Sequence, residues 1–338
     1  MEHHSCRDWG NHPTGVTVRN LPIDDNPRHA AMSAACVTLA VGEVSPVRIG
    51  SLFSGYGGLD MAVTSVLRAD VAWHVEHEGA PSRILAHHYP DIPNHGDITA
   101  VDWSAVEPVD IITGGFPCQD ISSSGLKAGI HGQRSGLWSH YARAISHLRP
   151  RLVVVENVSA LIARGLGTVL GDLADLGYDA QWASLSACSV GAPFRRVRVF
   201  LVASPTGSDS WRSSQREEPD RVPLPRLKDG ANEHDGPDAD RLALGDRRAL
   251  ERWAAVTGRP WPSYCELGTK GQPRLTAQFS EWLMGLPDGW VTDPAIGIGR
   301  LDQLKALGNG VVPQQAALAL DVLLQGASDD IRQGLATV

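Results

Sequence analysis

The chain has 338 residues, of which 42% are hydrophobic and 20% charged, and its formal net charge is −8. This length suits one sizeable α/β core with a smaller appended domain. No apolar run approaches the ~18 residues that a membrane span requires, so a membrane role is disfavoured and a cytoplasmic location is expected by default. Because nucleic-acid-binding proteins usually carry a basic footprint, any phosphate-binding surface of this acidic chain must be local.

The five cysteines are odd in number and widely scattered, and no two form a C-x-x-C pair. They therefore favour neither a disulfide framework nor a structural zinc site, and we expect no bound metal. The metal-binding residue types near the N-terminus are interpreted as part of a polar terminus. These residues are His3, His4, Cys6 and His12.

Residues 1–46 contain four prolines and no sustained hydrophobic periodicity, which predicts a disordered N-terminal extension. From Val47 onward, short β-branched runs alternate with helical segments. Runs that are apolar on both faces are typical of parallel strands covered by helices, so we predict an α/β fold with a mostly parallel sheet. The expected strands are residues 47–53, 71–75, 109–113, 151–156 and 197–203.

This α/β pattern stops at residues 205–240, where Ser, Pro, Asp, Gly and Arg predominate and predict a linker or long exposed loop. Helical stretches are expected at 247–256 and 280–286. Near the C-terminus, the segment Leu307-Gly308-Asn309-Gly310-Val311-Val312-Pro313 is predicted to be turn-like or strand-like and to lead into an apolar helix that reaches Leu324.

A glycine-rich loop, residues 53–58, joins the first predicted strand to a helix that begins near Leu59. Glycines at such a junction let the backbone approach a ligand, although the loop taken alone is equally typical of a tight turn. Glu76 ends the next apolar run, where an acidic side chain commonly binds ribose hydroxyls. Asp97 is a candidate acceptor for an adenine amino group. Together these residues predict a nucleoside cofactor site.

The most informative segment is Gly114-Gly115-Phe116-Pro117-Cys118-Gln119, directly after a predicted strand. Free cysteines are often buried fillers, but a rigid loop at the carboxyl end of a strand exposes the thiol where ligands bind, which favours a catalytic nucleophile. Glu156 ends another buried strand. A carboxylate there is costly unless it is paired or protonated, so Glu156 is a candidate proton donor.

These blocks, in this order, resemble the motifs of DNA cytosine-5 methyltransferases, and the Gly-Gly-Phe-Pro-Cys-Gln and Glu156-Asn157-Val158 segments carry most of the resemblance. It continues through residues 192–198, 274–276, 283–287 and 307–313, and spans residues 47–325. The resemblance implies a Rossmann-like methyltransferase domain built from residues 47–204 plus 301–326. Residues 205–300 would then form an inserted target-recognition region.

The resemblance also implies the activity, which is transfer of a methyl group from S-adenosylmethionine to carbon 5 of cytosine in a specific double-stranded DNA sequence. The thiolate of Cys118 would add to carbon 6 of a flipped-out base, because that addition makes carbon 5 nucleophilic. Glu156 would protonate the ring at nitrogen 3, helped by Arg196 and Arg198. No residue is assigned as the base that removes the carbon-5 proton.

Further roles follow from the same resemblance. The cofactor contacts would be Phe53, Gly55, Gly57, Gly58, Glu76, Asp97, Ile98, Leu137 and Asn309. Composition adds two candidate DNA contacts. The Gly- and Ser-rich stretch 122–136, which carries Ser122, Lys127, Gln133 and Arg134, suits a mobile loop that closes over DNA, as in the resembling family. The cluster of Arg247, Arg248 and Arg252 is a candidate DNA-binding patch, although such a patch taken alone is more typical of a solvated charged face. Because Asn309 lies near the C-terminus, its segment must fold back against the first domain.

Two positions depart from the family pattern. Ser51 stands where an acidic residue is usual, which puts in doubt how the methionine end of the cofactor is held. Phe194 stands where a glutamine is usual, and this removes a hydrogen-bonding side chain while both arginine positions stay filled.

Three alternatives remain. An RNA cytosine-5 methyltransferase would use the same thiol chemistry; an inactive DNA-binding homologue would be expected to lack Cys118 or Glu156; and a nicotinamide-dependent oxidoreductase would leave the cysteine segment unexplained. We expect a monomer acting on double-stranded DNA. The sequence does not decide whether a restriction endonuclease acts on the same site, nor which DNA sequence is recognised.

Overall fold

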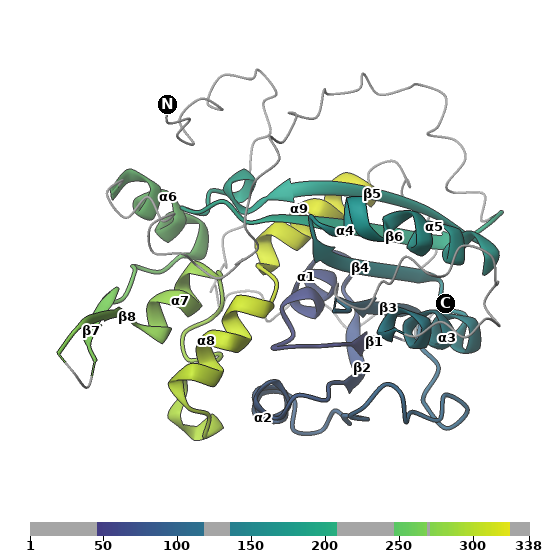
Figure 1. Ribbon diagram of the computed structural model, residues 1–338, viewed down its shortest axis with the longest axis horizontal. Helices are drawn as coiled ribbons and strands as arrows, with labels where there is room; N and C mark the ends of the chain where they lie inside the picture. The colour runs from purple at the N-terminus through teal and green to yellow at the C-terminus, as the bar shows by residue number, and fades with distance from the viewer. Residues whose placement is uncertain (1–45, 118–135, 208–246, 269–270, 325–338) are drawn as a thin grey trace, which may run out of the picture. The chain divides into compact units, whose positions relative to one another are not determined.

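A six-stranded sheet forms the centre of the computed structural model, with the strand order β2-β1-β3-β4-β6-β5 (Figure 1). Strands β2, β1, β3 and β4 run parallel, whereas β6 runs antiparallel to both of its neighbours. The mostly parallel sheet predicted from the alternating pattern is therefore confirmed. The strands are β1 Arg48–Leu52, β2 Asp70–Val75, β3 Ile111–Gly114, β4 Leu152–Val158, β5 Tyr178–Ser186 and β6 Val197–Pro205.

The structure describes residues 46–117, 136–207, 247–268 and 271–324, all of which belong to one compact unit. The predicted N-terminal extension and most of the predicted 205–240 loop lie outside these ranges. Contacts do not divide the unit further, so the separate target-recognition region stays a prediction. Within the described residues, no helix is long and apolar enough to cross a membrane.

Helices cover both faces of the sheet, each over its own hydrophobic cluster. On one face, α3 and α5 pack over Leu52, Ile112 and Val153. On the other face, α1 and α9 pack over Ile49, Ile111 and Val154, so the C-terminal helix lies against the first helix of the fold. These helices and two neighbours are α1 Gly58–Leu67, α2 Gly79–His88, α3 Leu137–Leu148, α4 Leu161–Arg164, α5 Leu166–Asp175 and α9 Pro313–Leu324.

A third hydrophobic cluster organises the elements drawn at the left of Figure 1. Its centre is Trp253 of α6, which is fully buried and donates from its indole nitrogen to the carbonyl of Trp282 at 3.0 Å. Elements in this part of the chain are α6 Arg247–Thr257, β7 Cys265–Leu267, β8 Pro273–Leu275, α7 Ala277–Leu283 and α8 Arg300–Asn309, with short 3₁₀ turns at Ala187–Val190 and Pro294–Ile296.

Several elements were absent from the sequence prediction, among them β5 and α8. Strand β5 lies at the edge of the sheet, and most of its residues are only partly buried, so its sequence lacks the apolar run that marks the inner strands. Half of the ten residues of helix α8 are polar, and only Ala306 and Leu307 are buried, which leaves little hydrophobic periodicity to detect. Its last residue is Asn309, so the turn-like or strand-like prediction is wrong for residues 307–309, which are helical, and only residues 310–312 connect α8 to α9.

Candidate active site

The glycine loop, residues 53–58, turns the chain from β1 into α1 at the carboxyl edge of the sheet. Three of its residues adopt left-handed backbone angles, with φ of 51° at Phe53, 57° at Gly55 and 85° at Gly57. Glycine adopts this conformation without strain, whereas the backbone of Phe53 is strained there and needs stabilising contacts with its surroundings. One such contact is the Phe53 amide, which donates to the Val75 carbonyl at 2.8 Å.

Glu76 fastens this loop to the end of β2. One carboxylate oxygen accepts from the Gly55 amide at 2.8 Å, and the other accepts from the Glu78 amide at 2.7 Å. Burial raises the pKa of Glu76, and the two amide donors oppose that shift. Each oxygen keeps a second acceptor site, so the carboxylate can also bind ligand hydroxyl groups.

Beyond β2, Asp97 and Ile98 extend the same edge. One Asp97 carboxylate oxygen accepts from both the amide and the hydroxyl of Thr99 at 2.9 Å, and these bonds hold the pKa of Asp97 below its usual value. Ile98 is buried in the cluster against which Phe53 and Leu137 also pack. The predicted cofactor contacts therefore include an apolar wall beside a row of acidic groups.

The C-terminal segment returns to the glycine loop, as the predicted role of Asn309 requires. The Tyr56 hydroxyl donates to the Val311 carbonyl at 2.6 Å, across 255 residues of sequence. A Cβ atom on Gly310 would overlap the Tyr56 ring, so only glycine allows this approach. Asn309 itself is exposed at the end of α8, directly before this contact.

The Gly-Gly-Phe-Pro segment leaves β3 beside the end of β4. The side-chain amide of Asn157 donates to the Phe116 carbonyl at 2.8 Å, and a Cβ atom on Gly115 would lie 3.0 Å from a carboxylate oxygen of Glu156. The backbone before Cys118 is therefore held against Glu156 and Asn157. Cys118 itself lies outside the described residues, as do Ser122, Lys127, Gln133 and Arg134.

Glu156 forms a buried ion pair with Arg198 of the neighbouring strand β6, with 3.1 Å between the guanidinium Nε and a carboxylate oxygen. Both residues are less than a tenth exposed. Of the two states that the sequence allowed for a buried Glu156, the structure has the paired one. The guanidinium favours the ionised carboxylate in this state of the protein.

Arg196 has different neighbours. Its guanidinium donates to the carbonyls of Gly308 and Gly310, at 3.0 and 2.6 Å. These bonds tie β6 to the junction between α8 and α9, and so to the contact with Tyr56. In the described structure Arg196 positions the C-terminal segment, whereas Arg198 contacts Glu156.

The predicted DNA contacts on α6 lie on its exposed side, because Ala249, Leu250 and Trp253 form the buried side. Arg247, Arg248 and Arg252 are all exposed, and Arg247 pairs with Glu251 at 2.9 Å within the helix.

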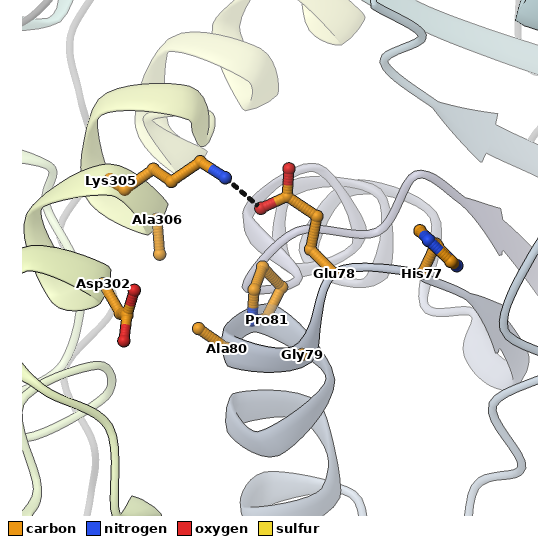
Figure 2. Close-up of a pocket in the computed structure, with 8 residues that line it drawn as sticks. All are labelled: His77, Glu78, Gly79, Ala80, Pro81, Asp302, Lys305 and Ala306. Carbon is orange, nitrogen blue, oxygen red and sulfur yellow. Dashed lines mark hydrogen bonds and ion pairs between the residues drawn. The ribbon is translucent and has the colours of Figure 1, made fainter.

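Figure 2 shows a cavity of about 360 Å³ between the N-terminus of α2 and helix α8. Its lining residues are His77, Glu78, Gly79, Ala80, Pro81, Asp302, Lys305 and Ala306, and the Lys305 ammonium lies 2.7 Å from the Glu78 carboxylate. Its lining residue His77 directly follows Glu76 in the sequence, but none of the predicted cofactor contacts lines the cavity. The predicted cofactor contacts lie instead at the carboxyl edge of the strands.

Several residues of this edge were not singled out from the sequence. Asn157 was considered only as part of a motif. Its position after Glu156 on a buried strand could have indicated a side-chain amide that hydrogen-bonds to a neighbouring backbone segment. Tyr56 and Asp60 are buried, and nothing in their local sequence announces the distant groups that they contact.

Comparisons with known proteins agree with this architecture. The family model described as C-5 cytosine-specific DNA methylase matches residues 47–247, which is more than half of the chain. The chain is 30% identical over 174 residues to the Type II methyltransferase M.NgoBV of Neisseria gonorrhoeae, a match that covers 47% of this chain and 41% of that protein. It is 32% identical over 155 residues to the Type II methyltransferase M1.ScrFI of Lactococcus lactis subsp. cremoris, covering 45% and 40%.

These matches span about two fifths of the length of the curated relatives. Among solved structures, a mutant of Spodoptera frugiperda DNMT2 superposes with a TM-score of 0.56 at 17% identity, over 82% of this chain and 99% of that one. At this identity the likeness concerns the fold, which is the Rossmann-like α/β fold of such methyltransferases. From the extent of the family match, the chain belongs to the C-5 cytosine-specific DNA methylase family.

Proposed function

We propose that this chain methylates carbon 5 of cytosine within a specific double-stranded DNA sequence, with S-adenosylmethionine as methyl donor and Cys118 as nucleophile. The observation that carries the proposal is the junction of β3, β4 and β6. There the backbone that leads to Cys118 is held by Asn157 and faces the Glu156–Arg198 pair. Addition of a thiol to a pyrimidine ring needs a carboxyl group and a guanidinium beside it, and the segment that leads to Cys118 departs next to both.

The residues of the glycine loop fit a nucleoside cofactor. A Cβ atom on Gly55 would meet no protein atom within 4 Å, so the loop leaves open space above it. Glu76 would bind ribose hydroxyls, Asp97 and Ile98 would contact adenine, and Phe53, Leu137 and Asn309 would complete the pocket. When bound, S-adenosylmethionine supplies an electrophilic methyl group on a sulfonium centre.

The protein groups have separate tasks in the proposed reaction. The Cys118 thiolate adds to carbon 6, while Glu156 gives a proton to nitrogen 3, so that no negative charge accumulates on the ring. Carbon 5 then becomes nucleophilic and gains the methyl group. Loss of the carbon-5 proton restores the double bond as the carbon–sulfur bond breaks and the nitrogen-3 proton returns to Glu156.

This scheme requires Glu156 to change protonation state. Paired with Arg198, the carboxylate is favoured in its ionised form. A cytosine that enters the site would exclude water from Glu156 and offer nitrogen 3 as a hydrogen-bond acceptor, and both changes favour the neutral acid. Arg198 keeps the carboxyl group aimed while the proton is bound.

Expression in a bacterial host that lacks DNA methylation tests the proposal. Conversion sequencing of the host DNA should place 5-methylcytosine in one short sequence context, and Cys118→Ala should abolish it. Cys265→Ala is the matched control, since Cys265 is an exposed free cysteine on the short strand β7. Methylation in RNA alone would favour the RNA enzyme, and methylation in neither would favour an inactive homologue. DNA methylated in this context should also resist restriction endonucleases that cleave the same sequence.

A further inference from the structure

Four polar side chains meet on the face of the sheet that α1 covers, directly below the glycine loop. The strand register places Ser51 of β1 opposite His74 of β2 and opposite Thr113 of β3. Register neighbours on parallel strands point to the same face, so these three side chains form a row. Asp60 of α1 contacts this row from above.

The Asp60 carboxylate joins the two inner strands of the row. One oxygen accepts from the Ser51 hydroxyl at 2.7 Å, and the other accepts from the Thr113 hydroxyl at 2.6 Å. Asp60 is only 1% exposed. Hydrogen bonds between buried groups at these lengths fix the relative positions of the elements that carry them.

This carboxylate has no positively charged partner near pH 7 among the residues that the structure describes. His74 Nδ1 lies 4.0 Å from it, but burial lowers the pKa of His74 to about 4, so the ring is neutral. The other titratable groups nearby are the phenols of Tyr89 and Tyr141. A buried, uncompensated carboxylate costs stability, and groups of this kind are concentrated at functional sites.

The two bonds lie just before the two loops of the candidate site. Ser51 precedes Phe53 of the glycine loop by two residues, and Thr113 directly precedes the Gly114-Gly115-Phe116-Pro117-Cys118 segment. Asp60 itself lies in the first turn of α1, which begins where the glycine loop ends. One carboxylate therefore links the backbone of the predicted methyl-donor site to the strand end from which the segment toward the predicted nucleophile departs.

We infer that Asp60 is a positioning residue for methyl transfer, because its carboxylate ties Ser51 of β1 to Thr113 of β3. The inference rests on the proposed function. Asp60 sets the distance between the two loops and touches neither substrate. Because a displacement of about 1 Å at reacting atoms can cost ~10²-fold in rate, loss of this link should act mainly on kcat.

The test is a carboxylate exchange. Asp60→Ser should lower kcat about 10²-fold, with KM for S-adenosylmethionine changed less than about 3-fold. The double variant Ser51→Asp/Asp60→Ser returns a carboxylate to the same face, next to Thr113, and should recover most of the lost kcat. Asp175→Ser, which removes an exposed carboxylate at the end of α5, is the matched control and should behave as wild type.

Two results would overturn the inference. One is an unchanged kcat in Asp60→Ser; the other is a double variant that melts like the wild type but stays as slow as Asp60→Ser. Should Asp60→Ser fail to fold, Thr113→Val removes one hydroxyl donor while keeping the shape of the side chain, and it must lower kcat in the same direction. An inactive wild type would instead refute the proposed function, so the two failures are distinguishable.

Discussion

Two effects on Glu156 oppose each other. The ion pair with Arg198 favours the ionised carboxylate, whereas the proposed reaction needs the protonated acid. Glu156→Gln keeps the size of the side chain and removes the proton that it can transfer. We expect kcat to fall about 10²- to 10⁴-fold, the usual contribution of a general acid, while the affinity for S-adenosylmethionine measured by calorimetry stays unchanged. A variant with wild-type kcat would remove Glu156 from the reaction.

A second residue-scale prediction concerns stability and pH. Burial raises the pKa of Asp60 from 3.8 to about 6. Between these values the folded state holds a proton that the unfolded state has lost, so this group lowers the free energy of unfolding as pH rises from about 4 to about 6, by at most ~3 kcal/mol.

The side chain in Asp60→Asn cannot titrate. Chemical denaturation should therefore show that the wild type loses free energy of unfolding relative to Asp60→Asn as pH rises from about 4 to about 6, and that the difference is constant at higher pH. His74, whose lowered pKa acts in the opposite direction, is common to both proteins. A difference independent of pH would show that Asp60 does not titrate there.

Single site residues could be predicted from the sequence where an ionisable side chain lies at the end of a predicted strand. Glu76 and Glu156 each end or nearly end a buried strand, and the structure has both carboxylates at the same edge. The role of Asp60 could not be predicted in this way, because its hydrogen-bond partners come from two strands and the sequence of its own helix does not indicate them. The contact of Arg196 with Gly308 and Gly310 depends in the same way on a segment more than 100 residues away.

Among the elements, the junction of α8 and α9 is the one most sensitive to a single methyl group. Gly310→Ala would push a Cβ atom into the Tyr56 ring, although its φ of −81° suits any residue. We expect a loss of about 1 to 3 kcal/mol in the free energy of unfolding, as is typical of overpacking.

Gly308→Ala is the matched control. A Cβ atom there meets nothing within 4 Å, and alanine favours the helix. Thermal denaturation should therefore show Gly310→Ala well below the wild type and Gly308→Ala equal to it or above. Equal melting temperatures for the two variants would contradict the packing described at Tyr56.

Helix α6 offers a prediction about DNA. Trp253 and Leu250 anchor it, and the exposed side carries Arg248 and Arg252. Replacing either arginine by alanine should weaken DNA binding without lowering the melting temperature. If the arginine contacts a guanine edge, the variant should lose ~1 to 3 kcal/mol of discrimination between bases at one position of the methylated sequence. If it contacts phosphate, methylation should fall equally at all sites. Unchanged binding by both variants would remove α6 from the DNA interface.

Elements were predictable from the sequence where burial was complete. The inner strands β1, β3 and β4 are buried almost throughout, and their β-branched runs mark them. The edge strand β5 and helix α8 receive their order from neighbours, through β6 and through α7 and α2, so their own sequences carry a weaker pattern. The antiparallel direction of β6 is likewise a property of the assembled sheet.

For the whole molecule, the main feature is convergence at one edge of the sheet. The glycine loop follows β1, Glu76 follows β2, the segment before Cys118 follows β3, and Glu156 lies near the end of β4. Parallel strands bring their carboxyl ends to one edge, so motifs spread over 100 residues become neighbours there. The antiparallel strand β6 adds Arg198 from its beginning, because its start lies beside the end of β4.

The most direct test of the central claim is a covalent trap. Duplex DNA that carries 5-fluorocytosine in the recognised context, incubated with the protein and S-adenosylmethionine, should give a denaturation-resistant complex, because fluorine cannot leave as a proton does. Peptide mapping should place the bond on Cys118, and Cys118→Ala should give no complex. Methylation of ordinary DNA without a trapped complex, or a bond to another residue, would contradict the account.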